Sequence, residues 1–301
     1  DKGGVIGGLG WVGLSGVGSE PHPVYGPTIP HQAFMLFQLM FAAIAPALIT
    51  GAFAERKRFT SVVLFAALWS VFVYVPLAHW IWGGGWLAKL GALDFAGGAV
   101  IHISSGAAAL VCAIVLGQRR GYGTDYMAPH NLPMTLLGTG FLWFGWFGFN
   151  GGSALGANGI AVSAIIATHA AAAMGAIAWC GAEWAHRGKP TVLGVASGAV
   201  AGLATVTPAA GYIAPMSAIA IGLVAGMTCY AAIVWKGRFG YDDSLDVVGI
   251  HGVGGVIGIL ATGLFASKVV NPGGADGLFF GNPGLFGIQL LVAAVTTIFS
   301  I

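Results

Sequence analysis

The sequence is poor in charge. Asp, Glu, Lys and Arg make up 7% of its 301 residues, and the formal net charge is +2. Soluble domains carry about 25% charged residues, so the chain falls outside that class. A net charge this small predicts no nucleic-acid partner. The three cysteines, Cys112, Cys180 and Cys229, lie in apolar runs without metal-ligand spacing, so they predict packing residues and no metal site.

Several catalytic motifs are also missing. The chain has no Walker A sequence, no GxGxxG ahead of a helix, no HExxH and no nucleophile elbow. Alternation over about 10 residues, which is typical of outer-membrane barrels, is missing too. These absences disfavour an enzyme and a porin-type barrel, and they predict no cofactor.

Long apolar runs are abundant. Hydrophobic residues make up 57% of the chain, and the runs are about 20 residues long, the length of a transmembrane helix. We therefore predict an all-α, polytopic membrane protein folded as one domain over residues 1–301, with residues 1–31 as an extracytoplasmic loop. The predicted spans lie near 32–54, 59–80, 94–117, 132–151, 158–184, 190–208, 213–235, 247–266 and 284–301.

Basic residues occupy every second connection. Nine of the twelve lie in four segments, 55–58, 118–120, 186–189 and 236–238. The positive-inside rule predicts that these segments are cytoplasmic. The chain is then a multi-pass protein of the cell (plasma) membrane, and its surroundings are the lipid bilayer.

Two spans of opposite direction carry the same unusual layout. Asp94 precedes His102 by eight positions, and Asp243 precedes His251 by eight. At 1.5 Å per residue each histidine lies roughly 12 Å deeper than its aspartate, near the middle of the membrane. Matched irregular helices in opposed halves indicate an inverted repeat with the functional site at its centre. We predict that the histidines converge and share a proton.

Each of these groups also has an ordinary role. A membrane histidine can be neutral and bonded to backbone, which is the role we expect for His169, alone in an Ala-rich span. Asp94 begins a helix and can cap it, and we favour a structural carboxylate at the outer mouth over a direct ligand. Asp243 and Asp246 are expected to be the corresponding inner caps, without chemistry of their own.

Aromatic residues gather at the outer interface. In "HWIWGGGW" (79–86), Trp80 and Trp86 are expected to anchor the bundle at the membrane surface. Trp82 precedes three glycines, which leaves one indole face open to a cation, although anchoring also accounts for it. A different use of the two histidines, a bis-histidine haem oxidoreductase, requires them to lie apart around a large pocket, and the Gly- and Ala-rich surroundings disfavour that.

Several segments resemble the Amt/Mep/Rh ammonium transporter superfamily, in its Amt branch. The similarity extends over the whole chain in the right order. The segments are "GAFAERKRF" (51–59), "AHWIWGGGWLAKLGALDFAGG" (78–98), "PHNLPM" (129–134), "GWFGFNGGSA" (145–154), "VTPAAGYI" (206–213) and "DVVGIHGVGG" (246–255). The resemblance implies ammonium or ammonia transport by a homotrimer with eleven spans and one pore per subunit. This chain would then hold the third to eleventh spans, without the first two and the C-terminal tail.

The same resemblance implies roles for individual residues. Phe41, Trp82 and Ser153 correspond to an outer ammonium site, and Phe41 and Phe149 to a pair of rings that closes the pore. Asp94 corresponds to the carboxylate that supports the outer site, and Thr207 is a weaker correspondence near the outer mouth. His102 and His251 correspond to twin histidines that line the pore. An ammonium sensor of the same fold stays a second possibility, as does a PII-type regulator at the cytoplasmic face.

Overall fold

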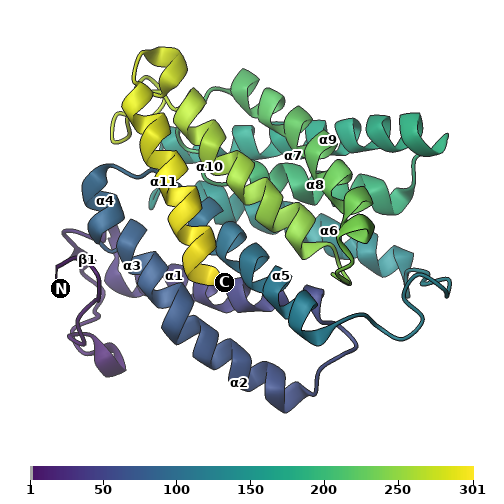
Figure 1. Ribbon diagram of the computed structural model, residues 1–301. Coiled ribbons are helices and arrows are strands. Elements are labelled where there is room, and N and C mark those ends of the chain that lie inside the picture. The colour runs from purple at the N-terminus through teal and green to yellow at the C-terminus, as the bar shows by residue number, and fades with distance from the viewer. Residues whose placement is uncertain (1–2) are drawn as a thin grey trace.

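The computed structural model describes residues 3–301, most of which are helical (Figure 1). The α-helices are α1 (His31–Ile49), α2 (Phe59–Trp69), α3 (Val75–Ile81), α4 (Trp86–Leu90), α5 (Ser104–Leu116), α6 (Leu132–Trp146), α7 (Gly159–Arg187), α8 (Val192–Val206), α9 (Pro215–Phe239), α10 (Gly254–Phe265) and α11 (Pro283–Ser300). Shorter 3-10 turns are Val12–Leu14, Thr50–Ala52 and Leu278–Phe280. A small antiparallel hairpin joins β1 (Pro21–His22) and β2 (Gly26–Pro30).

Four turns of π-helix interrupt or begin the spans. They are Ser70–Tyr74, Gly98–Ile103, Phe147–Gly151 and Val248–Val253. A π-turn is rare and widens the helix locally, and it is frequent at functional sites. Three of the four carry residues that the sequence singles out, namely His102, Phe149 and His251.

The all-helical membrane fold predicted from the sequence is confirmed. Among the described residues, 8 helical segments are long and apolar enough to cross a membrane. The predicted span near 190–208 is the shorter helix α8, which is followed by buried turns over residues 207–212. Its many buried Gly and Ala residues pack against α7 and α9, so α8 lies within the bundle.

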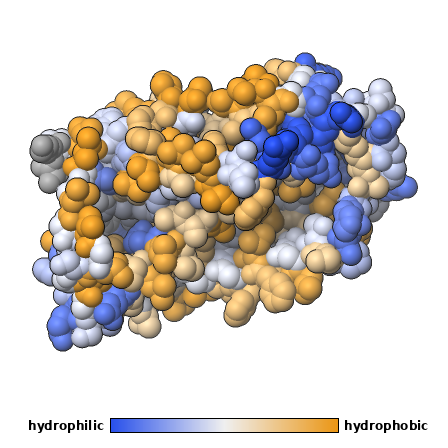
Figure 2. Space-filling model, turned by 90° about the horizontal axis from the view of Figure 1, so that it is seen from below, coloured by the Kyte–Doolittle hydropathy of each residue, from blue (hydrophilic) through white to orange (hydrophobic). Residues whose placement is uncertain are grey.

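The outer surface of the bundle is suited to lipid. Large apolar side chains of α2, of the π-turn Ser70–Tyr74 that follows it and of α6 are exposed, among them Leu64, Phe72, Phe141 and Phe144. Figure 2 shows one face on which hydrophobic residues cover the middle and hydrophilic residues gather toward opposite ends. Water would not favour such a surface, whereas a bilayer covers it without cost.

The two histidine-bearing segments cross at close range and pack reciprocally. Helix α5 packs on the π-turn that carries His251, and α10 packs on the π-turn that carries His102. A Cβ atom added at Gly106 would meet the Cα of Gly252 at 2.2 Å, and one added at Gly255 would meet Cβ of His102 at 3.0 Å. Each of Gly106 and Gly255 lies four residues after a histidine. The predicted inverted repeat therefore has its crossing point at the histidines.

The segment before α1 covers one end of the bundle, beside α3 and α4 (Figure 1). The Trp86 backbone amide donates to the carbonyl of Gly4 at 3.0 Å, and the Trp80 indole N–H donates to the carbonyl of Val5 at 2.8 Å. Trp80 is only 9% exposed, so the prediction that it anchors the bundle at the membrane surface is wrong. A hydrogen-bonded loop covers its ring, which the sequence pattern did not indicate.

At the opposite end, charged side chains join three connections. Arg119 binds both carboxylate oxygens of Asp242, at 2.8 and 2.9 Å, and Arg56 lies 3.8 Å from the same carboxylate. Burial alone would raise the pKa of Asp242, but hydrogen bonds from Arg119 and the charges of Arg119 and Arg56 lower it. The basic connections after α1, α5 and α9 are thus held together at one end of the bundle.

Candidate functional site

The Asp94 carboxylate organises the start of the span that carries His102. Its two oxygens accept the backbone N–H groups of Gly97, Gly98, Ala99 and Val100 at 2.6 to 3.1 Å. The chain must turn sharply to bring these amides together, and Gly97 does so with φ +116°. Asp94 is 5% exposed, and four donors occupy its oxygens. The carboxylate thus satisfies the free N–H groups at the start of the π-turn, which is the task of a cap, although Gly97 holds the N-cap position itself.

Asp94 also holds the indole of Trp82. The Trp82 indole N–H donates to the main-chain carbonyl of Asp94 at 2.7 Å. One residue therefore fixes both the π-turn that carries His102 and the orientation of the Trp82 ring at the outer end. Sequence reasoning assigned a supporting role to Asp94 but missed this second contact, which joins residues 12 positions apart.

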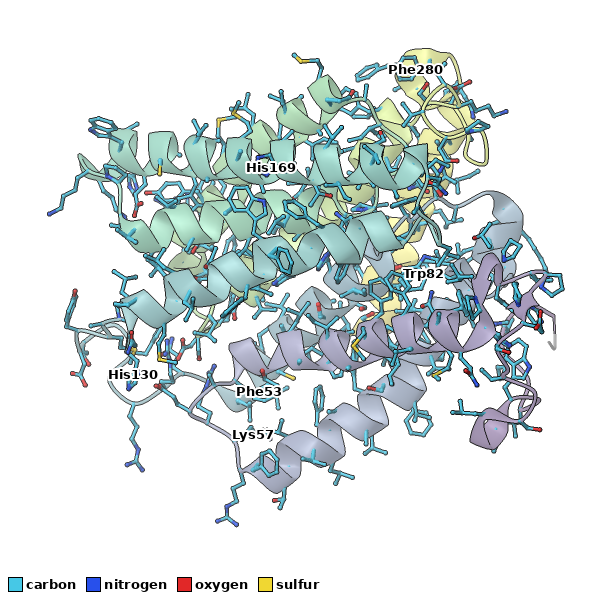
Figure 3. The ribbon with its side chains drawn as sticks, turned by 180° about the vertical axis from the view of Figure 1, so that it is seen from behind. Phe53, Lys57, Trp82, His130, His169 and Phe280 are labelled. Atoms are coloured by element: carbon cyan, nitrogen blue, oxygen red, sulfur yellow. The ribbon has the colours of Figure 1, made fainter. Side chains whose placement is uncertain are left out.

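Phe41, Trp82 and Ser153, the predicted outer trio, line one cavity of about 290 Å³. The Phe41 and Trp82 rings are 5.6 Å apart. The Ser153 hydroxyl donates to the carbonyl of Phe149 at 2.9 Å, so its oxygen keeps lone pairs that can accept a hydrogen bond. Figure 3 shows Trp82 near the end of the bundle covered by the N-terminal segment.

The β-hairpin forms part of the wall of this cavity. Val24 and Tyr25 line it together with Leu155, which follows Ser153 in the turn before α7. The Thr28 hydroxyl donates to the Leu155 carbonyl and ties the hairpin to that turn. Sequence reasoning treated residues 1–31 as a loop outside the bundle and missed this contribution to the site.

Two phenylalanines separate the cavity from the histidines. The Phe41 and Phe149 rings meet edge to face, with centroids 4.7 Å apart and an angle of 89°. The Phe149 ring is stacked parallel to His102 at 6.2 Å. Trp82, Phe41, Phe149, His102 and His251 therefore form a continuous row of rings from the outer cavity to the interior.

The two histidines meet in the interior, as predicted. Their Nδ1 atoms are 3.1 Å apart and their rings are nearly parallel, at 19°. His102 is 1% exposed and His251 is 7% exposed. One Nδ1 must donate and the other accept, so the two neutral rings hold opposite tautomers. Moving the shared proton requires both tautomers to change together.

One nitrogen of the pair is left without a partner. His102 Nε2 is buried and has no hydrogen-bond partner within residues 3–301. A buried polar atom without a partner costs free energy unless a ligand satisfies it. This nitrogen is available to a small polar molecule that reaches the interior.

Trp146 and Thr207 support the His102 ring. Trp146 stacks on His102 at 5.7 Å, and its indole N–H donates to the Thr207 hydroxyl at 2.9 Å. Thr207 in turn donates to the carbonyl of Leu203 and is fully buried. The resemblance implies an outer-mouth position for Thr207; the structure shows it behind Trp146 and next to Pro208, whose carbonyl accepts the N–H of Phe95, a residue of the outer cavity. Trp146 was missed because it stood inside an aromatic run without a distinguishing signal.

The histidine spacing does not suit haem. A haem iron with two histidine ligands holds their nitrogens on opposite sides of the metal, each at roughly 2 Å, so the two nitrogens cannot touch. The Nδ1 atoms here are in direct hydrogen-bond contact, and Gly106 and Gly252 bring the backbones together around them. Across residues 3–301, no three His, Cys, Asp or Glu side chains gather in a way that could hold a metal ion.

Two further expectations are corrected. His169 is exposed on α7 rather than packed inside, and it touches the Trp143 and Phe147 rings (Figure 3). Asp246 does not cap the second π-turn, because it has a left-handed φ of 62° and pairs with Lys236. Asp243 is the inner cap, and its Oδ2 accepts the Val248 N–H at 2.7 Å.

Comparison with known proteins agrees with this geometry. A sequence profile described as the Ammonium Transporter Family matches residues 4–301. The chain belongs to the ammonium transporter family. It is 54% identical over 296 residues to an ammonium transporter of Bacillus subtilis, covering 98% of this chain and 72% of the relative. It is 50% identical to the ammonium transporter Amt1 of Archaeoglobus fulgidus, covering 100% of this chain and 73% of the relative.

Solved structures of ammonium transporter relatives have the same fold. The crystal structure of Saccharomyces cerevisiae Mep2 superposes with a TM-score of 0.93 at 39% identity, over 99% of this chain and 68% of Mep2. A structure described as a sensor Amt protein superposes with a TM-score of 0.86 at 33% identity, over 100% of this chain and 75% of that one. The family assignment made from the sequence is therefore confirmed.

Proposed function

We propose that this chain transports ammonium across the membrane. The observation that supports this proposal is the row of rings from Trp82 to His251. The row joins an outer cavity whose aromatic faces can bind a cation to a buried pair of histidine nitrogens that can exchange a proton. Family membership supports the substrate, because the relatives are named ammonium transporters.

The first step is recruitment of the ammonium ion at the outer cavity. The faces of Phe41 and Trp82 attract a cation through their ring quadrupoles, each with about 0.5–2 kcal/mol. Ser153 accepts an N–H hydrogen bond, since its own hydrogen is given to Phe149. Asp94 contributes by holding the indole in place and does not ligate the ion.

The second step separates the proton from ammonia. Beyond Phe41 and Phe149 the path is lined by rings, and an ion that enters such surroundings loses its hydration without compensation. Ammonium can give up a proton and continue as neutral ammonia, whereas K⁺ cannot. The Phe41 and Phe149 pair thereby favours ammonium over K⁺, an ion of similar size, because only ammonium can become neutral by losing a proton.

The third step takes place at the histidines. Ammonia reaches His102 Nε2, which has no partner among the described residues. The Nδ1–Nδ1 hydrogen bond offers a route for the separated proton, by a joint change of tautomer. On this proposal, net transport moves charge, and both histidines are needed for the current.

The basic connections indicate how the bundle is oriented in the membrane. We assign them to the cytoplasm of a plasma-membrane protein, on the positive-inside rule. A PII-type regulator would then meet the basic end of the bundle.

The exposed His169 supports a homotrimer. A histidine exposed in the middle of a span is rare on lipid-facing surfaces, so we expect His169, with Trp143 and Phe147, to be buried between copies of the chain.

The test is ammonium-dependent flux into proteoliposomes, measured for wild type, Trp82→Phe and Trp82→Leu. Phe keeps a ring face and Leu does not, so the ammonium concentration for half-maximal flux should rise by about 2- to 30-fold from Phe to Leu. The similarity to a sensor Amt protein gives the second candidate. Ammonium binding without any flux in the wild type would contradict transport and favour the sensor.

A further inference from the structure

Asp243 occupies the position that Asp94 has in the other half, but its carboxylate is not satisfied. It is 1% exposed, and its Oδ2 accepts the Val248 N–H at the start of the π-turn that carries His251. Its Oδ1 is buried and has no hydrogen-bond partner among residues 3–301. A buried carboxylate oxygen with negative charge and no donor is among the costliest groups in a protein interior.

A proton removes that cost. A neutral carboxyl group without a partner is far cheaper to bury than a charged one, and its second oxygen can still accept the Val248 N–H. Burial raises the pKa of Asp94 as well, but hydrogen bonds from four amides oppose that rise. The same position in the repeat therefore stabilises the charged carboxylate more strongly in one half than in the other.

Charged neighbours of Asp243 do not cancel this tendency. Lys236 of α9 donates to the Asp243 main-chain carbonyl at 2.8 Å, and its charge is paired with the Asp246 carboxylate. Tyr241 lies two positions before Asp243 in the sequence. The charge of Asp242, between them, is neutralised by Arg119 and Arg56. Burial first, and then the charge of Asp246, raise the pKa of Asp243 to about 6, against the lowering effects of the Val248 N–H, the Lys236 charge and the Val247 N–H.

We infer that Asp243 is a proton-binding site at the inner end of the pathway, and that its ionisation positions His251. The ionised carboxylate caps the π-turn with a charge-assisted hydrogen bond, and the protonated form caps it more weakly. Asp243 is a positioning residue, since it acts on His251 through the helix. The effect on transport rests on the proposed function, whereas the proton-binding site itself does not.

The sign of the pH dependence follows from the raised pKa. An unfolded Asp titrates near pH 3.9, so the folded protein binds the extra proton between about pH 4 and pH 6. The contribution of Asp243 to the free energy of unfolding is fully present below about pH 4 and is lost as the pH rises through about 6. Above pH 6 the charged cap is formed at the expense of stability, and flux should be highest there.

Proton binding can be measured without transport. Infrared difference spectra of the purified protein, recorded from pH 4.5 to 7.5, should show a carboxyl C=O band that titrates near pH 6. The band should be missing in Asp243→Asn and retained in Glu183→Gln, which replaces another buried carboxylate at the same end of the bundle. An unchanged band in Asp243→Asn would overturn the assignment.

The positioning role is tested by flux at controlled internal pH, together with thermal unfolding at pH 7.5. Wild-type flux should fall about 10-fold as internal pH drops from 7 to 5. In Asp243→Asn, flux should be low and independent of pH, while the Tm should equal or exceed that of wild type. A lower Tm, or a wild-type pH profile in this variant, would show an ordinary structural cap and overturn the inference. Wild-type protein without flux at any pH would instead contradict the proposed function.

Discussion

The two halves of the bundle share a layout and differ in how they treat their aspartates. Asp94 and Asp243 each lie eight positions before one of the two paired histidines and just ahead of a π-turn. Hydrogen bonds from four amides hold the first carboxylate, whereas the Val248 N–H binds one oxygen of the second, whose other oxygen has no hydrogen-bond partner among the described residues. The two halves therefore share the geometry at the centre and differ in how their aspartates are held.

The histidines show the same contrast. His102 stacks on Trp146 and Phe149 and keeps a nitrogen without a partner, which suits contact with the substrate. His251 has His102 as its stacked aromatic neighbour among the ring contacts of the described residues. The outer half thus holds its histidine rigidly, and the inner half leaves its histidine dependent on one carboxylate.

The largest expected effect comes from breaking the rigid half. Asp94→Ala removes the acceptor for four buried N–H groups, and it should cost about 3 kcal/mol of unfolding free energy and abolish ammonium-dependent flux. Thermal unfolding and proteoliposome flux check both. Asp94→Asn, which keeps acceptor oxygen, is the control and should retain a folded protein. Wild-type stability in Asp94→Ala would contradict the capping role.

A matched pair of glycines tests the crossing itself. Gly106→Ala places a methyl 2.2 Å from the Gly252 backbone, which cannot move aside, and should cost about 1–3 kcal/mol and most of the flux. Gly252→Ala meets Gly106 at an ordinary 3.4 Å and should leave stability and flux close to wild type. Equal effects of the two substitutions on Tm would show that the helices are not packed as described.

A smaller effect is expected behind His102. Thr207→Val keeps the shape of the side chain but removes the hydroxyl that accepts the Trp146 indole N–H, at a cost of about 1 kcal/mol. Flux should fall severalfold, while the ammonium concentration for half-maximal flux should stay unchanged, because Thr207 does not line the outer cavity. A shift in that concentration with normal maximal flux would place Thr207 at the outer site instead.

Hydropathy and spacing predict much of this molecule. Apolar runs locate the spans within a few residues, because the bilayer fixes both their length and their composition. The eight-residue spacing of Asp94 with His102 and of Asp243 with His251 predicts the central pair, since opposed helices of equal rise meet at equal depth. Resemblance to the family adds the outer trio, which the structure brings to one cavity.

Other features depend on contacts that a linear pattern does not encode. Two of the four π-turns begin where Asp94 and Asp243 accept backbone N–H groups, and no residue type marks any of the four. The Trp146 ring is held by a hydrogen bond from its indole N–H to the Thr207 hydroxyl, 61 positions away in the sequence. His169 sits in an Ala-rich run with no marked polar face, so its exposure could not be predicted from composition.

The most direct test of the account is a double-mutant cycle on the histidines. Ammonium-evoked current would be recorded from proteoliposomes of wild type, His102→Ala, His251→Ala and the double variant, with equal amounts of folded protein. Because the pair shares one proton through the Nδ1 atoms, each single substitution should abolish the current, and the double variant should be no worse than either one. Substantial current in either single variant, or losses that multiply in the double variant, would contradict a histidine pair that acts as one unit.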